Sequence, residues 1–275
     1  MRQKQFEDFV RNVEPAGRRC ALAWRTAIGL MATDGLKTSK YLLELAKRNI
    51  EGEISMPEVP MLIERYYRGK TRRAKDFFMK KEADREAANI KSVLSDNSFS
   101  FNLEGLISIH RRIFEGVSEY AGALRDNNLE KKEWLLNGDT MRFFEGKNVC
   151  EAVESDLRNE SVFDYDGLND VRKVRHISVF ASNLWLIHPF HVGNTCTIAV
   201  FMIQYLRSMG YEVNNDVFAE KSWYFRNALV RANYKNQDIG VDYDFRFLER
   251  FFKNLIFNCN NRLRINHLVV WKNKK

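Results

Sequence analysis

Proline and glycine are scarce in this sequence, with 4 and 14 occurrences among 275 residues. Because these two residues most often interrupt helices, their scarcity allows long helical stretches. The four cysteines are scattered and form no Cys-x-x-Cys pair, which favours a reduced, intracellular chain. Hydrophobic residues make up 45% of the chain, enough for one large core or for a core with a smaller helical appendage.

Long apolar runs are also absent. None approaches the roughly 18 residues that a membrane-spanning helix needs. Residues 1–20 carry charges throughout, in place of the apolar segment of a signal peptide. We therefore expect a cytoplasmic protein that does not contact membranes, and secretion by a route that leaves no such signal stays open.

Acidic residues are fewer than basic ones, and the net charge is +8. The basic residues concentrate in 65–85, where Asp76, Glu82 and Asp84 interrupt them. This pattern suits a solvated helix face with ion pairs at i,i+4 better than a nucleic-acid-binding face. Nucleic acid is therefore not an expected partner.

Apolar residues recur at three- and four-residue spacings almost everywhere, which predicts a mainly α-helical protein. Ser55 and Glu58 have capping-box spacing at the start of one predicted helix, and residues 71–94 have the pattern of a long, mostly exposed helix. The helices are predicted over 40–50, 55–70, 71–94, 103–117, 150–160, 171–188, 195–210, 216–234 and 242–268.

The pattern changes between residues 127 and 148. There the sequence Asn-Gly-Asp (137–139) lies between the segments EWLL (133–136) and TMRFF (140–144). Asn-Gly between two apolar runs is a strong short-range sign of a β-hairpin. Two short strands are therefore predicted in an otherwise helical chain.

Residues 187–201, IHPFHVGNTCTIAVF, join two predicted helices. Pro189 ends the first helix after His188, which falls on the buried face of that helix. Gly193 and Asn194 permit a tight turn that re-enters a helix. The N–H groups of residues 193–197 then lack intrahelical partners, and together with the helix dipole they favour an anion such as phosphate.

Side chains near this turn could add chemistry. Thr195 and Thr197 can donate hydroxyl hydrogen bonds to the anion, and His188 can take a proton from an attacking hydroxyl. A base beside an anion site suits phosphoryl or nucleotidyl transfer. A helix–loop–helix with a histidine satisfied in the core explains the same residues and stays open.

Two rival chemistries are disfavoured. A metal site on His188 and His191 lacks nearby acidic ligands, and the spacing of the two histidines includes a proline. Cys196 lies near a helix N-terminus, which could make it a nucleophile, but no further orienting residue is apparent. We therefore predict no metal ligands, and a small buried cysteine at 196.

The segment HPFHVGNTCTIA resembles the signature of Fic-domain proteins, H-x-F-x-[D/E]-G-N-G-R-x-x-R, and His188, Phe190, Gly193 and Asn194 match in register. Residues 109–126 and 224–234 resemble the family's segments before and after the motif, and LLNGDT resembles its active-site hairpin. The likeness runs over roughly residues 100–255. It implies the mainly helical Fic-type bundle with a short β-hairpin flap over the active site.

The family transfers AMP from ATP to a Ser, Thr or Tyr hydroxyl of a target protein. The resemblance therefore implies an ATP donor, a protein partner and His188 as the catalytic base. It implies nucleotide binding by Phe190, Gly193, Asn194, Thr195 and Thr197. It also implies that a target segment adds as a strand to the flap residues Leu136, Asn137, Gly138, Asp139 and Thr140.

Other positions of the motif are substituted. Val192 stands in place of the acid that holds Mg²⁺ in the family, which puts Mg²⁺ binding in doubt. Cys196 and Ala199 replace the two arginines, and neither offers a guanidinium to a phosphate. Losing one preorganised charge-stabilising group typically lowers the rate about 10²–10³-fold. The resemblance thus supports the fold more firmly than the activity.

Residues 47–70 resemble the small antitoxin-like helical module found with Fic domains. Glu51, in Ile-Glu-Gly, resembles the glutamate of its inhibitory motif [S/T]-x-x-x-E-[G/N]. In the family that glutamate pairs with the second motif arginine, which here is Ala199. We predict two domains, an N-terminal helical region over 1–96 with this inhibitory module and a Fic domain over 97–275.

Two functions follow from the resemblance. One is a Fic-type protein adenylyltransferase, a nucleotidyltransferase weakened by its eroded motif. The other is a catalytically silent Fic-fold module that holds a protein partner through the flap. Other Fic-like proteins transfer different phosphate-containing groups, so the donor stays open, as does assembly into a homo-oligomer.

Overall fold

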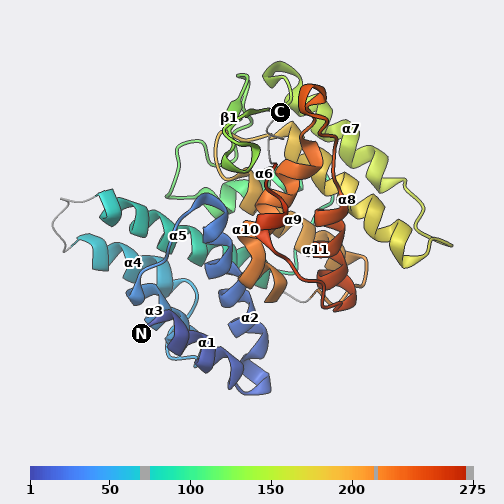
Figure 1. The fold of residues 1–275 in the computed structure, drawn as a ribbon. Coiled ribbons are helices and arrows are strands. Elements are labelled where there is room, and N and C mark those ends of the chain that lie inside the picture. The colour runs from blue at the N-terminus through green and yellow to red at the C-terminus, as the bar shows by residue number, and fades with distance from the viewer. Residues whose placement is uncertain (69–74, 214–215, 271–275) are drawn as a thin grey trace.

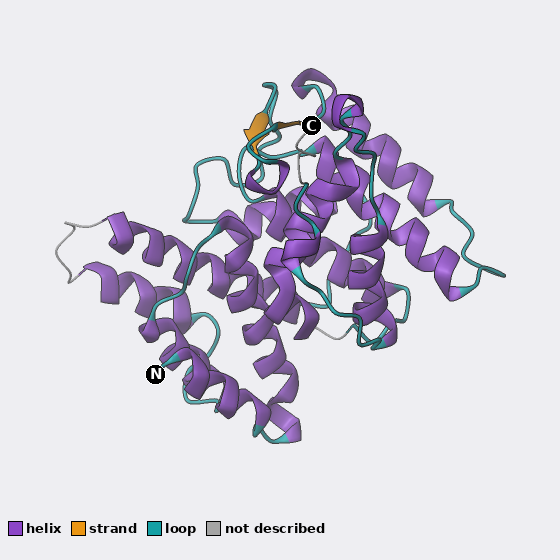
Figure 2. Ribbon diagram, in the orientation of Figure 1, coloured by secondary structure: helices purple, strands orange, loops and turns teal. Residues whose placement is uncertain are grey.

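The computed structural model describes residues 1–68, 75–213 and 216–270. Over these residues the protein is mainly α-helical, as predicted, with one two-stranded antiparallel sheet. Figures 1 and 2 show the helices gathered into one body, with the hairpin at its upper edge in this view.

The first third of the chain is helical. Its elements are α1 (Gln3–Arg11), α2 (Pro15–Leu30), the 3-10 turn η1 (Met31–Asp34), α3 (Lys40–Ile50), α4 (Glu58–Arg68) and α5 (Lys75–Ser95). The Ser39 hydroxyl caps α3 by accepting the N–H of Leu42. The predicted pairing of Ser55 with Glu58 is confirmed, because the N–H and hydroxyl of Ser55 both donate to Glu58 Oε2 at 2.7 Å.

The remaining elements carry the hairpin and the longest buried helices. They are α6 (Leu103–Phe114), β1 (Glu130–Lys132), β2 (Thr140–Arg142), α7 (Val149–Ser161), α8 (Asp170–Ile187), α9 (Asn194–Ser208), α10 (Asp216–Asn233) and α11 (Arg246–Phe257). The side chains of Asn102 and Asn169 cap α6 and α8. These caps satisfy N–H groups that a helix start otherwise leaves without partners.

Helix α9 forms the centre of the core, as predicted. Every residue from Asn194 to Leu206 is buried, and α5, α6 and α8 contact this helix. A helix that is buried on all sides is stable only inside a protein. The surrounding helices therefore fix the position of the α9 N-terminus.

The N-terminal helices pack closely against this core. Helix α2 contacts both α5 and α10, and a Cβ at Gly29 would lie 2.2 Å from the Ala219 carbonyl oxygen. Arg25 on α2 pairs with Glu7, Asp216 and Glu220. The close contact between α2 and α10 brings the end of η1 to the site described below. The division at residues 96 and 97 stays a prediction.

Two predicted helices differ from those observed. Helix α5 is not mostly exposed, because Ala87, Ala88 and Ile90 are fully buried where α2, α6 and α9 pack against it. The last helix was expected to reach residue 268, but α11 ends at Phe257. Asn258 follows it in the left-handed conformation, which asparagine tolerates at a helix end.

The hairpin turn is where the sequence predicts it, but one strand is not. Asn137 and Gly138 both have positive φ, as a tight hairpin turn requires. The strand that pairs with β2 is Glu130–Lys132, with Lys131 opposite Met141. Residues Trp134–Leu136 form a 3-10 turn instead, because Leu135 and Leu136 are buried in the core.

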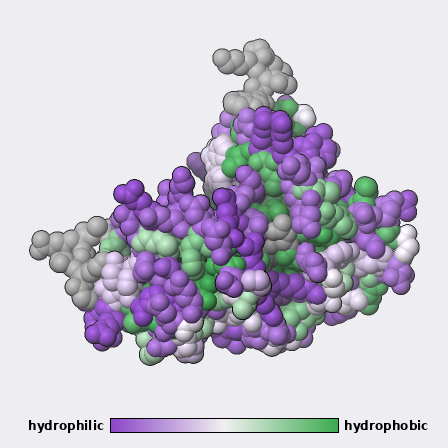
Figure 3. All heavy atoms as spheres, turned by 90° about the horizontal axis from the view of Figure 1, so that it is seen from below, coloured by the Kyte–Doolittle hydropathy of each residue, from purple (hydrophilic) through white to green (hydrophobic). Residues whose placement is uncertain are grey.

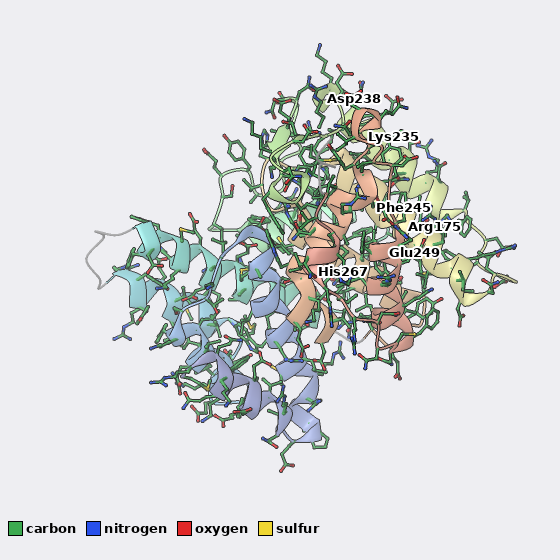
Figure 4. The ribbon with its side chains drawn as sticks, viewed as in Figure 1. Arg175, Lys235, Asp238, Phe245, Glu249 and His267 are labelled. Carbon is green, nitrogen blue, oxygen red and sulfur yellow. The ribbon has the colours of Figure 1, made fainter. Side chains whose placement is uncertain are left out.

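The surface carries mixed charges. Hydrophilic residues cover most of the face in Figure 3, with apolar residues between them. Figure 4 shows Arg175 of α8 beside Phe245 and Glu249, where it forms an ion pair of 2.7 Å with Glu249. Part of the basic stretch 65–85 lies outside the described residues. Among the described helices, none has the length and apolarity needed to cross a bilayer.

Candidate active site

His188 lies where α8 ends, and its backbone is in the left-handed region with φ 52°. Arg125 fixes this unusual turn. Its buried guanidinium donates to the carbonyls of Ile187 and His188, and also to Phe144 at the base of the hairpin. Pro189 prevents α8 from continuing past His188. Arg125, distant in sequence, joins the C-terminal end of α8 to the base of the hairpin.

The imidazole of His188 is buried and has one free nitrogen. Nδ1 lies 3.3 Å from the Trp185 carbonyl oxygen. A carbonyl only accepts, so we assign the proton to Nδ1, which leaves a lone pair on Nε2. Nε2 has no hydrogen-bond partner. Burial, and then the nearby Lys131 charge, hold the pKa of His188 well below its usual value, so the ring is neutral at neutral pH.

The loop after His188 is held rigidly. Asn194 Oδ1 accepts the N–H of Phe190, and Asn194 Nδ2 donates to the Phe190 carbonyl. The Phe190 ring stacks on His110 at 3.7 Å, and His110 Nε2 lies 3.2 Å from the Val192 carbonyl oxygen. Phe190 and Asn194 therefore shape the loop, and their side chains do not line the cavity described below.

Gly193 precedes α9 and is there for two reasons. Its φ is +64°, which favours glycine, and a Cβ at this position would lie 1.8 Å from Phe114 Cζ. The first N–H bonded within the helix is that of Thr197, which donates to the Gly193 carbonyl. The preceding N–H groups form the anion-favouring helix start that the sequence predicts.

The hairpin covers His188 with residues other than the predicted ones. Phe143, just after β2, stacks on the His188 ring at 3.8 Å. Asp139 at the turn instead accepts the Tyr234 hydroxyl at 2.6 Å, and Asn137 donates to the Val270 carbonyl. The predicted flap residues 136–140 thus anchor the hairpin to the C-terminal part of the chain.

These elements enclose a cavity of about 300 Å³ beside His188. Its walls come from η1, the hairpin, α8, α9 and α10. The lining residues are Thr33, Asp34, Gly35, Lys131, Phe143, Trp185, His188, Thr195, Trp223 and Arg226. Arg226 also forms a two-pronged ion pair with Glu133, at 2.5 and 2.6 Å.

Two acids lie near the start of α9. Cys196 Sγ donates to Glu86 Oε1 at 3.3 Å, and ligand atoms of Asp34, Glu86 and Cys196 all lie within 4.8 Å of one another. Burial, followed by the Asp34 charge, raises the pKa of Glu86 to about 8. Burial and the same two acids raise the pKa of the Cys196 thiol well above its usual value. Cys196 is thus a buried thiol, as the sequence predicts.

The structure brings only some of the predicted site residues together. His188 and Thr195 line the cavity, and the Thr195 hydroxyl accepts the Trp185 indole N–H at 3.0 Å. Thr197 is fully buried and does not line it. Glu51 ends α3, where it pairs with Lys47 at 3.7 Å. Glu51 is not among the residues that line the cavity.

The sequence-based prediction missed the charged residues at the cavity, Asp34, Lys131 and Arg226, and Glu86 beside the start of α9. These four residues come from four separate elements. Only Asp34 carried a local sign, because Asp-Gly after an apolar stretch indicates a helix end. The other three occur in ordinary amphipathic patterns, so nothing local separates them from solvated surface residues.

Comparison with known proteins agrees with this architecture. Residues 100–206 match the model of the Fic/DOC family. The solved structure of a Fic family protein from Desulfovibrio desulfuricans G20 superposes with a TM-score of 0.55 at 14% identity, over 90% of this chain and 67% of that one. The N-terminal Fic domain of a Bartonella effector protein from Bartonella sp. AR 15-3 gives 0.50 at 20% identity, covering 64% and 82%.

Two curated proteins are similar in sequence. The chain is 24% identical to the protein adenylyltransferase VbhT of Bartonella schoenbuchensis over 142 residues, which cover 52% of this chain and 28% of that protein. It is 24% identical to the probable protein adenylyltransferase Fic of Escherichia coli (strain K12) over 123 residues, covering 44% and 58%. The chain therefore spans less than two thirds of either relative, but the mainly helical Fic fold with its hairpin is established.

Proposed function

Since residues 100–206 of this chain match the Fic/DOC family model, we propose that it transfers AMP from ATP to a hydroxyl of a target protein, at a rate lowered by its motif substitutions. In this proposal His188 is the base and the N–H groups at the start of α9 hold a phosphate. Its sequence relatives named as adenylyltransferases support the reaction class.

One observation carries the proposal. His188 Nε2 is a buried imidazole nitrogen with a lone pair and no partner, and it faces a cavity that Thr195 in the first turn of α9 also lines. A neutral base must meet the hydroxyl whose proton it removes, and an anion held at a helix start must lie within reach. Because His188 and the first turn of α9 line the same cavity, a hydroxyl and a phosphate could both bind there.

The substitutions and the acids around α9 support a low rate. Val192 offers no carboxylate, and Cys196 is directed at Glu86. Burial raises the pKa of Asp34, and wherever this carboxyl close to the helix start is ionised it opposes a bound phosphate by like-charge repulsion. We propose that Asp34, and not Glu51, is the N-terminal acid that limits nucleotide binding, because only Asp34 lines the cavity.

A silent binding module is the second candidate. Among the described residues, β1 pairs only with β2, and the side chains of Glu130, Lys131 and Lys132 are all exposed. A target segment could add to this short sheet through backbone hydrogen bonds without any chemistry. The acids near α9 oppose ATP binding, and this favours a role without catalysis.

Label transfer from α-³²P ATP to the protein itself or to a lysate separates the two candidates. The unmodified protein should label weakly, and Val192→Glu with Cys196→Arg should label faster, because the pair restores a metal ligand and a guanidinium. Arg at 196 would meet Glu86 and Asp34, so adding Asp34→Asn should raise labelling further. Adding His188→Ala should abolish the gain, whereas Glu51→Gly, the matched control, should change little.

Two outcomes would contradict parts of this account. Efficient labelling by the unmodified protein that His188→Ala removes would show that the motif substitutions do not weaken catalysis. No labelling by the repaired variants, with folding intact and His188 present, would favour the binding module.

A further inference from the structure

The thiol of Cys196 faces two carboxylates from distant parts of the chain. Glu86 comes from α5 and Asp34 from η1, and Cys196 lies in the first turn of α9. Glu86 Oε1 is 3.3 Å from Cys196 Sγ, and the three ligand atoms lie within 4.8 Å of one another. Donor atoms around a single tetrahedral zinc ion, each about 2.0–2.3 Å from it, are about 3.3–3.8 Å apart, so the three side chains would need to draw together by about 1 Å or more to hold an ion.

The buried carboxylate of this cluster lacks a cation. Glu86 is 3% exposed, and no Lys or Arg among the described residues lies within ion-pair distance of it. The charges of Lys131 and Arg226 act on Asp34 instead, and Arg226 is already bound to Glu133. A buried carboxyl without a cation either keeps its proton or coordinates a metal.

A further side chain points to a ligand at this place. His188 Nε2 has no partner, its residue is 3% exposed, and it lines the same cavity as Asp34. Asp34 is an exposed residue that lines this cavity. The cluster therefore has two buried donors on one side and an open side from which an ion, water or substrate could enter.

We propose that Asp34, Glu86 and Cys196 bind one divalent transition-metal ion of the zinc class. The soft thiolate selects zinc over Mg²⁺, and the two carboxylates supply the remaining protein ligands. On binding, the thiol and the Glu86 carboxyl lose their protons to solvent, and metal–sulfur and metal–oxygen bonds form. Three protein ligands leave a position open toward the cavity, as in metal sites that also bind water or substrate.

The binding claim stands apart from the proposed transfer reaction. If that reaction occurs, a cation here would offset the two acids next to the α9 start, which otherwise oppose a phosphate. This second step rests on the proposed function, whereas metal binding is tested without any nucleotide. Failure of either one is therefore distinguishable from failure of the other.

Co²⁺ titration of the reduced, chelator-treated protein tests the site, because Co²⁺ replaces zinc and reports its ligands spectroscopically. One equivalent of Co²⁺ should produce the near-ultraviolet band of a thiolate–Co²⁺ bond, and Zn²⁺ should displace it. Cys196→Ser should remove that band. Asp34→Asn, at an exposed side chain that does not endanger folding, should weaken Co²⁺ binding at least about tenfold, since even indirect metal contacts contribute that much.

The exposed thiols provide the matched control. Cys150 and Cys259 are exposed, and a variant with both changed to serine should keep the band and the affinity. Loss of the band in that variant, with its persistence in Cys196→Ser, would overturn the proposal in favour of surface thiols. The absence of saturable Co²⁺ binding by the folded protein would overturn it as well.

Discussion

Gly193→Ala should be strongly destabilising, because two separate effects add at this position. A non-glycine residue in the left-handed region costs roughly 1–2 kcal/mol. The new methyl group would also overlap the Phe114 ring, whose Cζ lies 1.8 Å from the Cβ position. Phe114 is itself buried against His110, so relieving the overlap should cost about 1–3 kcal/mol more. The free energy of unfolding should therefore fall by about 2–5 kcal/mol.

Urea unfolding followed by circular dichroism measures this loss, and two further variants divide it. Gly138→Ala is the matched control, because φ is +80° there and nothing lies within 4 Å of the added Cβ; it should lose only the roughly 1–2 kcal/mol of backbone strain. Phe114→Leu combined with Gly193→Ala should lose about 1–3 kcal/mol less than the two single losses together. A loss below about 1 kcal/mol for Gly193→Ala, or perfect additivity with Phe114→Leu, would refute the packing that positions the α9 start.

Three other outcomes are expected. Burial lowers the pKa of His110 to about 4, so the unfolded state binds more protons than the folded state between pH 6.5 and 4. The free energy of unfolding should therefore fall by about 3 kcal/mol as the pH drops from above 6.5 to 4. Unfolding measured at several pH values should show a smaller fall in His110→Gln. Arg125→Met should cost about 3 kcal/mol or more, because several buried carbonyls lose their donor at once; an equal stability by thermal unfolding would contradict its role in fixing the turn at His188. In calorimetric titration with ATP and chelator, Asp34→Asn should raise the affinity for ATP severalfold, because a charge leaves the cavity. Glu51→Gly should change this affinity less than about twofold. A tenfold gain for Glu51→Gly, about 1.4 kcal/mol, would show that Glu51 does inhibit.

Hydrophobic spacing alone predicted much of the helical architecture. The recurrence of apolar residues every three or four positions marked α3, α6, α8 and α9, because each helix is built from bonds between residues four apart. Pro189 and Gly193 likewise marked the break between α8 and α9, since both act on their own backbone dihedrals. The hairpin turn at Asn137 was predictable for the same local reason.

Strand pairing and helix ends were less predictable from the sequence. The segment Trp134–Leu136 has a strand-like composition but forms a 3-10 turn, because both of its leucines are buried in the core of the folded chain. Helix α11 stops at Phe257 although apolar residues continue. In both cases packing against other elements decided the outcome over local preference.

The surroundings of His188 were decided by tertiary structure. The sequence identified His188 and the helix start that follows it, but Arg125, Phe143 and Asp34 reach the site from distant elements. Their placement depends on how the hairpin folds back over α8 and how closely α2 packs against α10. A local pattern can set a residue's own conformation, but it carries no information on which distant side chain will face it. This is why the motif revealed the base, whereas only the folded chain showed that Asp34, and not Glu51, shares its cavity.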